Sequence, residues 1–144
     1  MITSLSQLIA WAESSNQISA TRFEPAFVPD LLSIQRCAAA ANVDIGNARR
    51  ICATSYGKYQ ILGCELYRRQ IITGPIQAYQ ADEAAQDNSF MVFIAQKGIL
   101  YTLDQILNNA DDRNNFAHLY NGNAAAYGPY LLKVYAEHQN ANAN

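Results

Sequence analysis

The sequence predicts an all-α domain of about seven short helices around a buried central helix. Three observations support this class. Apolar residues recur at spacings of three and four, which gathers their side chains on one face of a helix. No run alternates apolar and polar residues in the manner of a strand. The 144 residues are 50% hydrophobic and 15% charged, which fits one compact core and argues against extended disorder.

The first predicted helix begins near Ser4 and runs to Glu13, before Ser14-Ser-Asn16 breaks the pattern. Ser4 and Gln7 have the spacing of a capping box, in which both side chains satisfy backbone donors that a helix leaves unpaired at its start. Glu13 falls in the last turn, on the flank of a core face made of Leu5, Leu8, Ile9 and Ala12. Its side chain is therefore expected to be neither fully buried nor fully exposed.

Glu13 is the first candidate for chemistry. Partial burial and the negative end of a helix dipole both favour the protonated form of a carboxyl. A carboxyl that holds its proton is suited to act as a general acid. The alternative is a solvated glutamate at a frayed helix end, and Glu13 taken alone leaves that alternative open.

Two breaks flank the second predicted helix. Pro25 keeps the residue before it out of helical geometry, so 22–27 is expected to be extended or a turn. The helix itself covers 29–41, with Pro29 suited to its first turn. Residues 42–54 are polar and interrupted by glycine, which predicts a loop or a short hairpin.

The predicted central helix follows Asp82, which is expected to cap it. Its second half, Phe90 to Ala95, is apolar on every side, as in a helix that runs through the middle of a core. Gly98 ends it. Shorter helical segments are expected before and after it: 56–63, 64–72, one that starts after the break at 73–75, and 102–107.

Two further helices are expected near the C-terminus. Asp111 or Asp112 caps the first, and Gly122 ends it. Pro129 opens the last helix, since proline suits a first turn. Four side chains are expected on the inner face of that helix: Tyr130, Leu131, Val134 and Tyr135.

Charge and hydropathy exclude several classes of partner. The formal net charge is -2, and without a basic excess neither nucleic acid nor an anionic membrane surface is an expected partner. No stretch of about 18 apolar residues occurs, so no membrane insertion is expected. The first residues lack a cationic start followed by an apolar run, which predicts synthesis in the cytoplasm without a signal peptide.

The cysteines and histidines predict neither a metal site nor a cofactor. Cys37, Cys52 and Cys64 are odd in number and lack the spacing of a zinc cluster or a disulfide scaffold. They are interpreted as reduced thiols. A thiol enzyme would need one of them beside His118 or His138, whereas small buried cysteines in helices are the commoner case.

Two later stretches carry polar groups at fixed offsets. Ser55 and Gln60 flank a glycine at a predicted junction from loop to helix, where they would hydrogen-bond an N-acetyl group or a ring hydroxyl. Tyr120 and Asn121 stand at the end of a helix closed by Gly122. Each stretch by itself also fits ordinary helix capping.

Taken together with Glu13, these stretches resemble the lysozyme-like superfamily of peptidoglycan-cleaving enzymes in order and spacing. The resemblance is nearest to the N-acetylmuramidase family of phage endolysins and bacterial exolysins, with goose-type lysozymes and lytic transglycosylases more distant. The matching motifs are Ala12-Glu13-Ser14, Phe23-Glu24, Ser55 to Ile61, and Tyr120-Asn-Gly122 before a tyrosine-rich helix. One departure follows the Phe-Glu pair, which the family commonly continues with arginine and histidine, whereas Pro25 and Ala26 follow it here.

The resemblance implies a lysozyme-like catalytic domain over 1–138, with a frayed polar tail at 139–144. It implies an N-acetylmuramidase that cleaves the β-1,4 bond between MurNAc and GlcNAc, with Glu13 as general acid. Glu24 would be the second catalytic carboxylate. The residues implied to bind substrate are Ser55, Tyr56, Gln60, Tyr120 and Asn121.

Other outcomes remain open at the level of sequence. Asp30 and Asp44 stand behind Glu24 as second carboxylates. A lytic transglycosylase needs none, because the sugar's own hydroxyl attacks and leaves an anhydro end. A helical module that binds the cell wall without turnover is the non-enzymatic alternative.

The expected partner is the peptidoglycan glycan strand, met by a monomer in the bacterial cell wall or periplasm. Without an export signal, a phage lysis protein, a virion-associated enzyme and an effector delivered by other machinery all fit.

Overall fold

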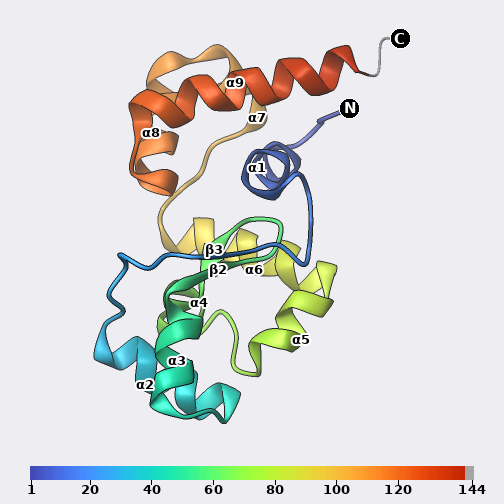
Figure 1. The fold of residues 1–144 in the computed structure, drawn as a ribbon. Coiled ribbons are helices and arrows are strands. Elements are labelled where there is room, and N and C mark those ends of the chain that lie inside the picture. Colours follow the sequence, from blue (N-terminus) through green and yellow to red (C-terminus); the bar gives the residue numbers. More distant parts are fainter. Residues whose placement is uncertain (142–144) are drawn as a thin grey trace. The chain divides into compact units, whose positions relative to one another are not determined.

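The structure, a computed structural model, describes residues 1–141 and is predominantly helical (Figure 1). It contains nine helices and one three-stranded sheet within those residues, so the all-α class is confirmed, with more helices than expected. The chain divides into two compact units, one made of Met1–Asn16 with Ile94–Asn144 and the other of Gln17–Phe93. No helix in the described range is both long and apolar enough to cross a membrane.

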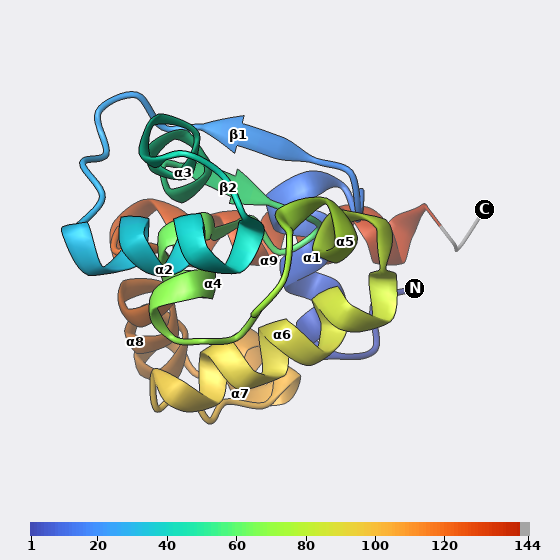
Figure 2. The ribbon, with the colours of Figure 1, turned by 90° about the horizontal axis from the view of Figure 1, so that it is seen from below.

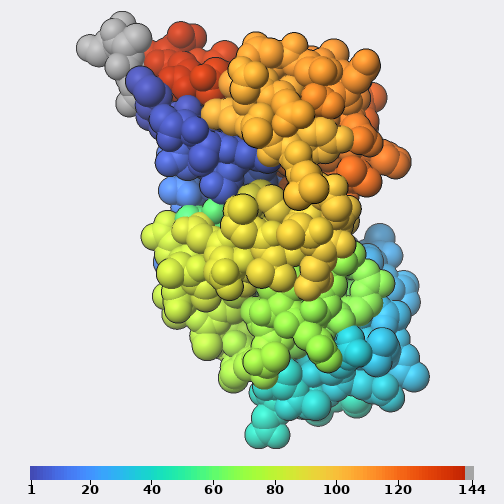
Figure 3. All heavy atoms as spheres, turned by 180° about the vertical axis from the view of Figure 1, so that it is seen from behind, coloured from blue at the N-terminus to red at the C-terminus, as the bar shows by residue number. Residues whose placement is uncertain are grey.

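The first unit combines the two ends of the chain. Its N-terminal residues lie beside its last helix (Figure 3), where Gln139 Nε2 donates to the carbonyl of Ile2 over 3.0 Å. Side chains from all four helices fill its core, among them Leu8, Ile106, Phe116 and Leu131. The helices are α1 (Leu5–Ser14), α7 (Leu103–Asn108), α8 (Ala110–Asn121) and α9 (Ala124–Asn140).

The predicted start of α1 is confirmed. Ser4 is the N-cap, and its side chain accepts a hydrogen bond from the backbone N–H of Gln7. The amide oxygen of Gln7 accepts in turn from the backbone N–H of Thr3 over 2.8 Å. The pairing satisfies free donors at the helix start, one residue earlier than in a regular capping box.

Two predicted helix starts in the first unit are wrong. The cap of α8 is Asn109, whose side chain accepts from the backbone N–H groups of Asp111 and Asp112. The amide oxygen of Asn109 accepts both backbone hydrogen bonds at the helix start. The two aspartates instead lie in the first turn, where the positive end of the helix dipole favours their negative charges. Helix α9 begins at an Asn123 cap and contains Pro129 in its interior.

The inner face of α9 agrees with the prediction in part. Leu131 and Val134 are buried, Tyr135 is half-buried, and Tyr130 is 43% exposed. The helix continues to Asn140, into the expected tail. Residues 142–144 of that tail lie outside the described residues.

The second unit holds the sheet and the remaining helices. Strand β2 lies between β1 and β3, antiparallel to both. Helix α2 packs against α3 and α4 (Figure 2). The elements are β1 (Thr21–Phe23), α2 (Leu31–Ala41), α3 (Ile45–Cys52), β2 (Thr54–Tyr56), β3 (Ile61–Leu62), α4 (Gly63–Arg68) and α5 (Ile76–Ala81), while α6 (Glu83–Gln96) starts here and ends in the first unit.

The expected loop over 42–54 is wrong, because α3 occupies most of it. Asp44 caps this helix by accepting from the backbone N–H of Asn47 over 2.8 Å. Only Ala48 and Cys52 of α3 are buried, so the helix carries a short apolar stripe that a search for longer periodicity overlooks.

The helical piece expected over 56–63 is also wrong, since β2 and β3 form a hairpin there. Gly57 and Gln60 have positive φ angles of 73° and 49°, a conformation that helices exclude. Thr54, Tyr56 and Ile61 are the side-chain types that suit a sheet.

Helix α6 starts and ends as predicted. The side chain of Asp82 accepts from the N–H of Ala85 over 3.0 Å, and Gly98 has a φ of 71°. Phe90 is buried, whereas Met91 is 55% exposed. The expectation of a central helix buried on every side is therefore wrong, because α6 is buried along one side and open along another.

Candidate active site

Glu13 lies in the last turn of α1, which two residues in left-handed conformation close. Ser15 has a φ of 54°, and its N–H donates to the carbonyls of Ala10 and Trp11. The N–H of Asn16 also donates to the carbonyl of Ala10 over 2.9 Å. These bonds satisfy carbonyls at the helix end, so the backbone that carries the half-buried Glu13 is held in place.

Tyr127 of α9 contacts Glu13 directly. Its phenol donates a hydrogen bond to Glu13 Oε1. Burial and then the charge of Glu13 raise the pKa of Tyr127 well above its usual value, so the phenol keeps its proton and remains a donor. Sequence reasoning did not name Tyr127 as a site residue; the tyrosine-rich closing helix was the available signal.

A row of aromatic rings extends from this contact. Tyr120 stacks on Tyr127 with ring centroids 6.1 Å apart and on Phe116 at 5.5 Å. Tyr130 donates from its phenol to the carbonyl of Ala12 over 3.0 Å. The predicted residue Tyr120 is thus one ring away from Glu13, and Asn121 follows it as the exposed last residue of α8.

The remaining predicted site residues belong to the sheet of the second unit. Ser55 is the middle residue of β2, opposite Arg22 of β1 and Leu62 of β3, and is 2% exposed. Tyr56 follows it and is 6% exposed. Gln60 is half-buried and donates from Nε2 to the carbonyls of Gly57 and Ala20, over 2.8 and 3.2 Å. The structure therefore brings Ser55, Tyr56 and Gln60 together in one hairpin.

A fully buried glutamine, which sequence reasoning missed, supports the hairpin. Gln86 of α6 accepts at Oε1 from the N–H of Lys58 over 2.9 Å. Its Nε2 donates to the carbonyls of Ile18 and Tyr79, over 2.9 and 3.2 Å. A buried amide with its groups satisfied fixes the parts it joins, so Gln86 ties the hairpin turn to α5 and to the segment before β1.

Lys58 in the same turn forms two ion pairs. Its Nζ lies 2.9 Å from Glu83 and 2.6 Å from Asp87. Burial alone would lower the pKa of Lys58, but the hydrogen bonds and charges of the two acids outweigh burial and raise it. The lysine is therefore charged and anchors the hairpin to α6.

The carboxylates considered as second catalytic groups differ in environment. Glu24 lies just after β1, where Arg22 Nε is 2.5 Å from its carboxylate. Asp30 caps α2, and hydrogen bonds from the Ser33 side chain and backbone lower its pKa to about 2. Asp44 caps α3, and hydrogen bonds from Asn47 lower its pKa. The two aspartates are thus engaged at helix starts, whereas Glu24 is held by an ion pair.

The cysteines are free and buried. Sγ of Cys64 donates to Ser33 Oγ over 3.2 Å. Within residues 1–141, no group of three or more His, Cys, Asp or Glu side chains is placed to hold a metal ion.

Comparison with known proteins identifies the family. The family model described as N-acetylmuramidase matches residues 10–142. The endolysin of Enterobacteria phage PRD1 is 31% identical over 136 residues, which cover 88% of this chain and 91% of that endolysin. No solved structure gives a significant match. The chain therefore belongs to the N-acetylmuramidase family.

Proposed function

We propose that Glu13 is the general acid with which this chain cleaves the β-1,4 bond between MurNAc and GlcNAc. Family membership makes the chain a glycoside hydrolase that acts on peptidoglycan. Breaking a glycosidic bond requires a proton on the leaving oxygen while an oxocarbenium-like centre develops at the neighbouring carbon. A half-buried carboxyl at the end of a helix is suited to deliver that proton.

The observation that carries the proposal is the hydrogen bond from Tyr127 to Glu13. A general acid has to present its proton in a defined direction. Tyr127 holds Oε1, and Tyr130 holds the backbone one residue earlier through the carbonyl of Ala12. Two phenols of α9 therefore fix both the carboxyl and the helix end that carries it.

Glu24 is proposed as the second carboxylate. Arg22 Nε lies 2.5 Å from its carboxylate, and a carboxylate can accept a proton from an attacking water or attack the sugar itself. Its role would therefore be opposite to that of Glu13.

The remaining predicted residues would bind the glycan. The ring of Tyr120, one ring away from Glu13, offers a flat apolar surface that suits the face of a sugar. Ser55, Tyr56, Gln60 and Asn121 would complete the substrate contacts. The enzyme would act as a monomer on the bacterial cell wall, as a phage-encoded or virion-associated protein.

The test is a digest of purified peptidoglycan with the wild type and with Glu13→Gln. We expect released fragments with reducing MurNAc ends, read by mass spectrometry, and a loss of rate of about 10²–10⁴-fold in the variant. Glu137→Gln is the matched control, because Glu137 is an exposed glutamate paired with Lys133 at 3.8 Å. Glu24→Gln should lower the rate without changing the type of end.

Other products would contradict parts of the proposal. Ends lighter by one water identify a lytic transglycosylase and remove the role of Glu24. Reducing GlcNAc ends move the cut to the other glycosidic bond. A wild type that sediments with the wall and releases nothing would leave a binding module in place of an enzyme.

A further inference from the structure

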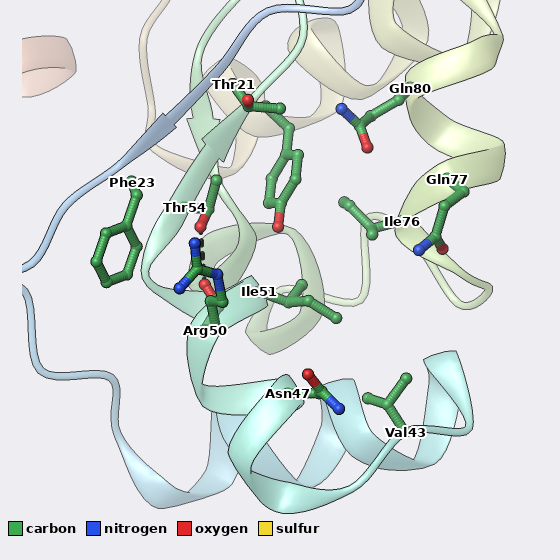
Figure 4. Close-up of a pocket in the computed structure, with 11 residues that line it drawn as sticks. Thr21, Phe23, Val43, Asn47, Arg50, Ile51, Thr54, Ile76, Gln77 and Gln80 are labelled. Atoms are coloured by element: carbon green, nitrogen blue, oxygen red, sulfur yellow. Dashed lines mark hydrogen bonds between the residues drawn. The ribbon is translucent and has the colours of Figure 1, made fainter.

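A pocket of about 390 Å³ opens on the second unit (Figure 4), within the size range of sites for small ligands. Strands β1 and β2, helix α3 and helix α5 all contribute to its wall. Every lining residue belongs to the unit Gln17–Phe93. The pocket is therefore complete without Glu13 or the tyrosine row, although Tyr56 lines it.

Among the described residues that line the pocket, Arg50 is the sole charged side chain. Its guanidinium lies 4.9 Å from the ring centre of Phe23, and its own carbonyl accepts from Thr54 Oγ1 over 2.8 Å. Among the described residues, none forms an ion pair with Arg50. Such an arginine favours an anionic ligand, and its planar fork matches a carboxylate.

Side-chain amides surround this charge. Gln77 and Gln80 project from α5, across the pocket from Arg50 and Asn47 of α3 (Figure 4). The two glutamines have no side-chain hydrogen bond to another described residue. Asn47 donates one amide hydrogen from Nδ2 to Asp44 over 2.7 Å, so its carbonyl oxygen and its second amide hydrogen are left for a ligand. Amides that both donate and accept match the peptide groups of a ligand.

We propose that this pocket binds the stem peptide of peptidoglycan through one of its free carboxylates. The inference rests on the proposed function, because the stem peptide belongs to that substrate. The carboxylate would pair with Arg50 and the peptide groups with the amides of Gln77 and Gln80. An apolar side made of Val43, Ile51 and Ile76 accommodates aliphatic parts of the peptide. A neutral sugar would offer no charge to Arg50.

The first test measures binding without catalysis. The probe is the soluble tetrapeptide L-Ala-D-isoGlu-diaminopimelate-D-Ala, added to isotope-labelled protein and followed by NMR. We expect the side-chain amide signals of Gln77 and Gln80 to shift. The affinity of Arg50→Ala for this peptide should be about tenfold lower than that of the wild type. The affinity of the wild type for a peptide with amidated carboxylates should be lower by the same factor. Arg49→Ala, which removes the same charge from the same helix outside the pocket lining, should bind as the wild type does.

The second test measures cleavage of peptidoglycan before and after an amidase has removed the stem peptides. Arg50→Ala should raise KM about tenfold on intact peptidoglycan and leave it unchanged on stripped glycan. Gln77→Ala should show a smaller change in the same direction, and because its side chain is exposed this variant reports on the site even if Arg50→Ala folds poorly.

The outcomes separate the pocket from the proposed function. The pocket proposal would be refuted if Arg50→Ala and Arg49→Ala lowered affinity equally, or if the probe shifted only signals of other residues. Neither result would bear on Glu13 as the general acid. Cleavage that persists in Glu13→Gln would overturn the proposed acid, while the probe would still report binding at the pocket.

Discussion

Tyr127 donates a hydrogen bond from its phenol to the carboxylate of Glu13, across 114 positions of the chain. The tyrosine is 6% exposed, and in such surroundings a bond to an ionisable group is stronger than in water. The orientation of Glu13 therefore depends on α9 as well as on α1.

Tyr127→Phe should lower kcat by about tenfold to a hundredfold with little change in KM, because a hydrogen bond to an ionisable group is lost. Tyr130→Phe is the control. It removes a phenol hydroxyl of the same helix that donates to the carbonyl of Ala12, and it leaves the bond to Glu13 in place. Equal losses of kcat in both variants would refute the positioning role.

The raised pKa of Tyr127 also predicts weaker folding in alkali. The folded chain holds this proton above the usual value of 10.0, so the unfolded chain loses it first as pH rises. Stability is then full below about pH 10 and falls above it. Urea midpoints at pH 8 and 11 should fall less steeply in Tyr127→Phe than in the wild type. A residual slope is expected because burial also raises the pKa values of Tyr56, Tyr67 and Tyr79.

Asp30 predicts a loss of stability in acid. Its pKa is about 2 in the folded chain, below the ordinary value of 3.8. The stabilising charge is therefore present above about pH 4 and lost as pH falls toward 2. Asp30→Asn keeps an oxygen acceptor for the Ser33 N–H but removes the charge. The difference between the two urea midpoints should shrink between pH 4 and pH 2; a constant difference would contradict the assignment.

Gly57→Ala should lower the free energy of unfolding by about 2–4 kcal/mol. Gly57 has a φ of 73°, and an added Cβ would lie 2.3 Å from Gln86 Oε1. The change strains the turn and displaces the amide that holds the hairpin. Gly74→Ala is the matched control, since no atom lies within 4 Å of its added Cβ. Denaturation midpoints that fall equally in both variants would contradict this account.

The predicted helices that proved right rest on contacts between near neighbours in sequence. Ser4 with Gln7 and Asp82 with Ala85 are separated by three residues, so the capping geometry is encoded locally. The hairpin was missed because its turn depends on Gln86, which bonds Lys58 from 28 positions away. The left-handed backbone of Gln60 in this turn is also not marked in the sequence by a residue type such as glycine that favours it.

The sequence by itself determined the helical class, several helix ends and the border position of Glu13, since caps and periodic faces act over a few residues. Only the tertiary structure decided that Tyr127 bonds Glu13, that the N–H of Glu24 donates to the carbonyl of Ala53 just before β2, and that Arg50 faces two glutamines in a pocket. The physical reason is that a folded chain fixes the distance and direction between residues far apart in sequence, which no local pattern specifies.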